Sequence, residues 1–228
     1  MSGGGLSPVP LMLAMAALSL IPFALLMVTC FVRISVVLSI LRSAIGAPQV
    51  PPSQVLTGLA LVLTLAVMAP TGERMLAAFA PVLPTLGAAA KVDLANDKTV
   101  AALGAAADHA KEPLRAFLVK HTGPRDRASF HALALKLRTP EERASVTDHD
   151  LAVIVPAFVT SELRRAFEIG FLIFLPFLVI DMVIANLLLA LGMHMLSPTT
   201  VSLPFKLLLF VVADGWTLVV RGLLESYA

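Results

Sequence analysis

Charged side chains are gathered in the middle of this 228-residue chain, and the stretches on either side carry almost none. Residues 73–168 hold 25 of the 32 Asp, Glu, Lys and Arg side chains, so the other 132 residues carry seven. Hydrophobic residues make up 58% of the chain and charged residues 14%, against roughly 45–50% and 25% in ordinary soluble domains. This composition excludes a disordered chain and argues against a simple soluble enzyme. The formal charge of +2, without a basic stripe, argues against nucleic-acid binding.

The first apolar region predicts a helical hairpin. Residues 11–32 carry no charge, and 22 residues are enough for a helix to cross about 30 Å of hydrocarbon. Arg33 interrupts this run. Three prolines and a glycine within residues 46–53 predict a turn, because proline lacks an amide donor and clashes with a preceding helical turn. A second apolar segment covers 55–68, and we expect it to end at Pro70.

The middle of the chain predicts a small helical insertion. It is rich in alanine, carries charges of both signs and lacks the alternation of β-branched residues that marks strands. Helical patterns cover 100–121 and 127–138. Thr139 followed by Pro140, with Glu142 at the third position, is typical of a helix start.

The carboxyl-terminal region predicts a second apolar hairpin. A charged collar at 161–165 precedes the apolar stretch 169–191, and a short break at 192–198 leads into a final apolar segment over about 200–224. The predicted organisation is an N-terminal tail at 1–10, a first hairpin at 11–72, an insertion at 73–160 and a second hairpin at 161–228.

Basic residues predict how the hairpins are oriented. Arg33 and Arg42 lie near the turn of the first hairpin, which the positive-inside rule places on the cytoplasmic side of a membrane. The insertion then lies on the extracytoplasmic side. The single cysteine, Cys30, excludes an intrachain disulfide.

Ionisable residues inside the apolar segments are the first candidate functional groups. Asp181, Lys206 and Asp214 would each cost about 2.5–3.5 kcal/mol at the centre of a bilayer, so we expect them to face protein or water. Asp181 and Lys206 lie on either side of the second turn, where the lysine can reach the aspartate of its own or a neighbouring chain. Arg33 belongs to the same class of buried, pairing charges. The two interpretations are charged contacts between packed helices and an ion or proton relay.

No pattern in the sequence indicates catalysis. Asp181 and Asp214 together suggest a protease that cuts within the membrane, but neither has the flanking glycines of a GxGD motif. The five histidines match no metal-ligand spacing, and there is no phosphate-binding loop or nucleophile elbow. We therefore expect no enzyme activity, no metal and no cofactor.

Two further patterns indicate contacts between helices. Ser35, Ser39 and Ser43 recur every four residues, so their small side chains share one helix face that another helix can approach closely. Met193 and Met195 lie at the second turn, on either side of His194. Methionine is flexible and polarizable, so a loop of this kind can close an irregular aperture where several chains meet.

Four long strings, in order and correctly spaced, resemble the FliP/SctR family of type III secretion export-apparatus proteins, flagellar and injectisome. They are LRSAIGAPQVPPSQVL at 41–56, EPLRAFLVKHT at 112–122, SELRRAFEIGFLIFLPFLVIDMVIANLLLALGM at 161–193 and SLPFKLLLFVVADGWTL at 202–218. The ending is more similar to the injectisome branch.

The resemblance implies an all-α, membrane-associated chain that assembles, five copies together, into a helical, ring-like export gate. A small two-helix export-apparatus subunit and a larger related subunit complete the gate, which passes unfolded proteins across the bacterial inner membrane. It implies that Met193 and Met195 belong to a methionine gasket, in which His194 replaces a middle methionine. It also implies that the hairpins are held partly above the bilayer, on the periplasmic side. The alternative from the residues alone is a self-sufficient ion-coupled transporter using Asp181 and Lys206.

Overall fold

The computed structural model describes residues 8–47, 50–80 and 97–228, and every regular element in these ranges is a helix. The chain is therefore all-α, as predicted. Residues 1–7 of the predicted tail and 81–96 of the predicted insertion lie outside the described residues. The helices are α1 (Pro8–Met27), α2 (Phe31–Ile45), α3 (Ser53–Phe79), α5 (Asp97–His121), α6 (Pro124–Leu137), α7 (Pro140–Arg143), α8 (Leu151–Ala190), α9 (Pro198–Val212) and α10 (Gly215–Glu225).

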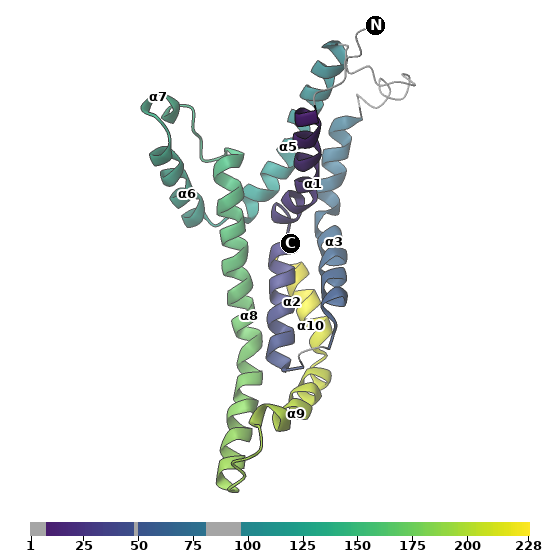
Figure 1. Ribbon diagram of the computed structural model, residues 1–228, viewed down its shortest axis with the longest axis vertical. Helices are drawn as coiled ribbons and strands as arrows, with labels where there is room; N and C mark the ends of the chain where they lie inside the picture. Colours follow the sequence, from purple (N-terminus) through teal and green to yellow (C-terminus); the bar gives the residue numbers. More distant parts are fainter. Residues whose placement is uncertain (1–7, 48–49, 81–96) are drawn as a thin grey trace.

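The 40-residue helix α8 forms the long axis of the molecule (Figure 1). α2 packs against its central part, α6 packs against its first half, and α9 packs against its second half. α3 lies on the other side of α2 and pairs with α5. α9 and α10 return from the far tip of α8 toward α2 and α3.

The hydrophobic core lies around α2. Its buried residues come from α2, α3, α5, the first half of α8 and the C-terminal end of the chain. A smaller cluster joins the end of α2 to Phe177 of α8 and Phe210 of α9. α2 and α8 approach closely at Gly170, where an added Cβ would lie 2.4 Å from Cδ1 of Ile40. Burial of α2 on several sides explains why apolar residues cover most of its surface outside the face of Ser35, Ser39 and Ser43.

The turn of the first hairpin forms where prolines and glycine lie in the sequence. α2 ends at Gly46, whose φ of 81° is a left-handed conformation that glycine adopts at little cost. α3 begins at Ser53, directly after Pro52. In the insertion, the α7 start has the predicted capping box, formed between Thr139 and Glu142, but the helix lasts only four residues.

One expected boundary of the first hairpin is wrong, the end at Pro70. In addition, a break at residues 28–30 divides the uncharged run 11–32, and Arg33 follows this break inside α2, where it is buried against a carboxylate. α3 continues through Pro70 to Phe79. A proline removes one backbone donor and kinks a helix without having to end it when neighbouring helices support the chain.

The carboxyl-terminal region differs in two ways. α8 runs unbroken from Leu151, so the predicted boundary between 160 and 161 falls inside one helix. The final segment, expected as one helix, bends by 60° between α9 and α10. Asp214 lies at the bend with φ 49° and ψ 49°, a left-handed conformation that stops α9.

Candidate functional site

The turn after α8 exposes the predicted gasket residues at the far end of the molecule (Figure 1). Gly192 has φ 71°, and the amide of Met193 donates to the carbonyl of Leu188 at 2.9 Å, which closes the helix end. The Met195 side chain is 99% exposed and Met193 is 43% exposed. His194 is exposed as well. These three side chains are therefore available to another molecule.

Asp181 and Lys206 meet directly across the second hairpin. Lys206 Nζ lies 2.6 Å from Asp181 Oδ2 and donates to the carbonyl of Ala44 at 3.1 Å. Ser202 Oγ donates to the other carboxylate oxygen at 2.6 Å. Lys206 is buried, while Asp181 is one quarter exposed. The lysine therefore links α9 both to α8 and to the carboxyl end of α2. The positive charge is also stabilised there by the negative end of the α2 helix dipole.

A second charge pair lies deeper and includes a residue that the sequence did not single out. Arg33 Nε donates to Glu162 Oε2 at 3.0 Å, and a second bond joins Arg33 Nη2 to Glu162 Oε1. Both residues are almost fully buried. The Tyr227 hydroxyl also donates to Glu162, and the Arg33 guanidinium lies 3.9 Å from the centre of the tyrosine ring. The sequence places Glu162 in a charged collar without assigning it a partner, although a lone arginine in an apolar helix calls for a buried carboxylate.

His121 lies beside this pair, outside the apolar spans. Its ring packs 4.7 Å from the ring of Phe117 and 5.1 Å from that of Tyr227, measured between centroids. Burial, helped by the charges of Lys120, Arg33 and Arg165, lowers the pKa of His121 to about 4. The histidine is therefore neutral at pH 7.

Asp214 is not brought into either pair. Its side chain is exposed and forms no hydrogen bond or ion pair with the part of the chain that the structure describes. An aspartyl protease needs two carboxylates close enough to share a proton. Asp181 is bonded to Lys206 and Ser202 instead, so the two aspartates do not form such a dyad. Within the described ranges, no three potential metal ligands come together.

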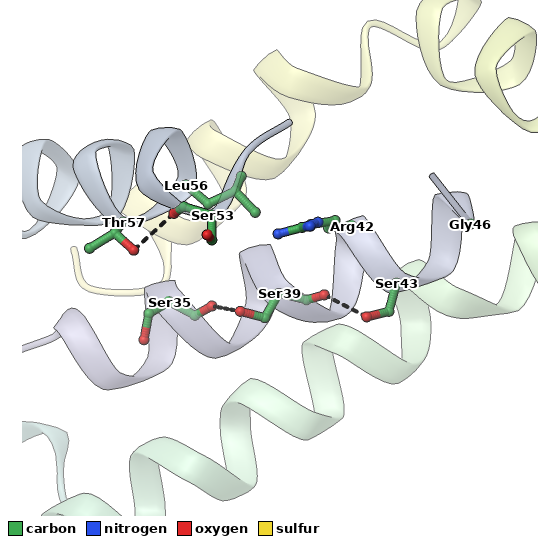
Figure 2. A pocket seen from close by; sticks show the side chains of 8 residues that line it. All are labelled: Ser35, Ser39, Arg42, Ser43, Gly46, Ser53, Leu56 and Thr57. Atoms are coloured by element: carbon green, nitrogen blue, oxygen red, sulfur yellow. Dashed lines mark hydrogen bonds between the residues drawn. The ribbon is translucent and has the colours of Figure 1, made fainter. Parts of the chain in front are cut away.

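The serine stripe lines a groove between α2 and the start of α3 (Figure 2). The groove has a volume of about 530 Å³, and Arg42 reaches across it toward Ser53 and Thr57. The hydroxyls of Ser35, Ser39 and Ser43 each donate to a backbone carbonyl three or four residues earlier. The three hydroxyl groups therefore line the groove as small side chains whose protons already form hydrogen bonds within α2.

Among the residues that the structure describes, two helices are long and apolar enough to cross a membrane, over Ser53–Ala77 and Leu151–Ala190. The bent pair formed by α9 and α10 is a third if it is counted as one span. These lengths and compositions are consistent with a membrane location.

The chain is similar to secretion proteins of both injectisome and flagellar systems. It is 43% identical over 211 residues to the hypersensitivity response secretion protein HrcR of Ralstonia nicotianae, covering 92% of this chain and 93% of the relative. It is 45% identical over 218 residues to the Yop proteins translocation protein R of Yersinia pestis, covering 95% of each. The flagellar biosynthetic protein FliP of Bacillus subtilis is 44% identical over 221 residues, with 97% and 92% covered.

These likenesses extend over nearly the whole length of the chain and of each relative. The FliP family matches residues 14–223, which include most of both hairpins, the insertion, the exposed turn and the two buried charge pairs. The chain belongs to the FliP family.

Proposed function

We propose that this chain is a structural subunit of the export gate of a bacterial type III secretion system. Five copies assemble with a small two-helix export-apparatus subunit and a larger related subunit into a helical, ring-like channel. Unfolded proteins pass through it across the inner membrane, and the chain itself catalyses no reaction. Support comes from membership of the FliP family and from relatives named for secretion, translocation and flagellar biosynthesis.

The observation that carries the proposal is the unpartnered apolar surface at the far end of the molecule. The second half of α8, α9 and the turn between them expose large hydrophobic side chains over most of their length. Contiguous apolar surface of this extent marks contact with protein or lipid. A chain that forms a channel wall needs such surface on the side that meets its neighbours.

The exposed turn supplies the proposed seal. Met193 and Met195 lie at the tip of a hairpin, so a ring of copies brings several methionines together around one axis. Flexible thioether side chains fill an irregular aperture and yield when a polypeptide enters. His194 adds a polar side chain between the two methionines.

We place the insertion on the periplasmic side of the inner membrane, with the hairpins held partly above the bilayer by the other subunits. The described part of the insertion carries exposed charges of both signs, which suits a face in water. Asp181 and Lys206 satisfy one another inside the chain, so this pair allows either a protein or a lipid environment around it.

Native mass spectrometry of the chain in mild detergent, alone and co-expressed with its candidate export subunits, tests the assembly. The proposal expects a discrete multi-copy complex that gains mass with those subunits. A monomer or dimer indifferent to them would contradict it. In that case the transporter becomes the better interpretation, and Asp181→Asn should abolish ion coupling where a gate subunit would lose only assembly strength.

Replacing both gasket methionines tests the seal. Met193→Ala combined with Met195→Ala should raise the leak of small solutes through the membrane several-fold while the complex keeps its mass, because the aperture loses its filling side chains. The matched control is Met182→Ala, an exposed methionine on α8 away from the turn. An unchanged leak in a fully assembled double variant would overturn the gasket.

A further inference from the structure

We infer that residues 226–228, which follow α10, form a strap that closes over the buried Arg33–Glu162 pair, and that acid releases this strap by protonating His121. The closed strap joins α2, α5 and α8, so it couples the insertion to the hairpins. Its release loosens that joint while the helices stay folded. The inference concerns a single chain and goes beyond the proposed function, so it holds or fails independently of the assembly.

Tyr227 is the anchored residue of the strap. Its side chain is 7% exposed, its hydroxyl donates to Glu162, and its ring centre lies 3.9 Å from the Arg33 guanidinium. The ring also stacks on that of Phe117 at 6.4 Å and packs against that of His121 at 5.1 Å, measured between centroids. Tyrosine suits this place because it combines an apolar ring with a hydroxyl that needs a partner when buried. One side chain therefore contacts α2, α5 and α8.

The residues on either side of Tyr227 are bound at the surface of the chain. Arg33 Nη1 donates to Ser226 Oγ at 2.9 Å, and Lys120 Nζ donates to the carbonyl of Ala228 at 3.0 Å. Ser226 and Ala228 are exposed, so water can replace both bonds. The strap can therefore leave at a small cost in hydrogen bonding, while the core around α2 keeps its other members.

Two hollows border the Tyr227 ring and give it room to move. Their volumes are about 460 Å³ and 230 Å³, and both are lined by Lys120, His121 and Tyr227. Because the two hollows share these three residues, withdrawal of the tyrosine ring joins them. His121, which is 6% exposed while the strap is closed, then comes into contact with water.

His121 is the group through which acid acts on the strap. Cationic side chains lie around it on four elements: Lys120 on α5, Arg33 on α2, Arg74 on α3 and Arg165 on α8. Two carboxylates lie nearby on α8, but Glu162 is already bonded to Arg33 and Tyr227, and Glu168 is exposed. A proton on the imidazole therefore adds like charge to a buried site. The site relieves this repulsion when Tyr227 leaves and water enters.

The two states of the strap bind this proton with different strength. Burial, together with Lys120, Arg33 and Arg165, lowers the pKa of His121 to about 4 in the closed state, whereas an imidazole in water has the ordinary 6.5. The released state therefore takes up the proton first, and acid favours release. Between pH 7 and pH 5 the ratio of released to closed strap should rise about 20-fold.

The chain contains a single tyrosine, so a label on tyrosine reports the strap alone. The full chain, labelled with fluorotyrosine in mild detergent, should give a fluorine NMR signal of a buried ring at pH 7. A second signal, typical of a ring in water, should grow as the pH falls to 5. Circular dichroism of the same samples should show an unchanged helix content. His121→Phe is the matched control and should remove most of this pH dependence.

A second variant brings a tightly closed strap into the measurable range. Ser226→Ala removes the bond to Arg33 Nη1 without changing His121, so it should raise the released signal at every pH. A signal that stays buried at pH 5 in both chains would overturn the inference. The same response in His121→Phe, or a helix content that falls together with the buried signal, would overturn it as well. None of these outcomes depends on how many copies assemble, so they are distinguishable from a failure of the proposed function.

Discussion

The two halves of α8 differ in what covers them, and the more apolar half is the more exposed. The first twenty residues carry four charged side chains and the last twenty carry one. Yet the first half buries eight residues within the chain: Val153, Ile154, Ala157, Phe158, Ser161, Glu162, Ala166 and Gly170. The second half buries two, Phe177 and Leu188.

This inversion separates two kinds of apolar surface. In the first half, side chains pack into the core of the same chain, so charge is tolerated where Glu162 meets Arg33. In the second half, the described helices cover only part of α8, so its hydrophobic side chains are exposed and can contact lipid or other subunits. The first half therefore supports the fold, whereas the second half presents apolar surface that the described part of the chain leaves largely uncovered.

Removing the buried carboxylate of Glu162 should have the largest effect, because it destabilises the core around the first half of α8. Glu162→Gln leaves Arg33 as an uncompensated buried charge, which costs about 3–5 kcal/mol. We expect little folded protein, measured as the yield of monodisperse protein and the midpoint of thermal unfolding in detergent. The control is Glu168→Gln, an exposed glutamate on the same helix, which should unfold like the wild type. Equal behaviour of the two variants would show that the Arg33 contact contributes nothing.

Acidification should destabilise the core around the first half of α8 through His121, which lies at the end of α5. Because its folded pKa of about 4 lies below the ordinary 6.5, the unfolded chain takes up the proton first. Stability present above pH 6.5 is therefore lost as the pH falls toward 4, by about 2 kcal/mol between pH 7 and pH 5. Thermal unfolding at the two pH values measures this. His121→Phe keeps an aromatic ring there and should reduce the pH dependence of stability. If the variant loses as much stability as the wild type between pH 7 and pH 5, other groups are responsible for the loss.

The same valine-to-threonine substitution, made once in each half of α8, tests their difference in burial and has the smallest expected effect. Val153→Thr places a hydroxyl at a core position that is 1% exposed and should lower the free energy of unfolding by about 1–2 kcal/mol. Val183→Thr makes the same change where the side chain is 52% exposed and should stay within about 0.5 kcal/mol. Denaturant titration of the isolated chain measures both. Equal losses would mean that the second half is already packed in the single chain.

Much of the secondary structure could be predicted because it depends on local chemistry. The turn at 46–53 follows from its prolines and glycine, and the turn after α8 follows from Gly192, whose left-handed backbone ends the helix. Pro70 was harder, since it lies inside α3 instead of ending it. Whether a proline ends a helix depends on the neighbours that hold the chain on both sides of it, and these are known only in the folded molecule.

The contact between Asp181 and Lys206 was foreseeable because the two residues flank one turn at matching distances. The pairing of Arg33 with Glu162 was not, because 129 residues separate them and each has several charged candidates. The all-α fold, the apolar hairpins, the methionine-containing turn and the family could all be inferred from the order of the residues alone. Which charges are buried, where the last helix bends and which half of α8 stays largely exposed are known only from the folded molecule, since these depend on contacts between segments far apart in the chain.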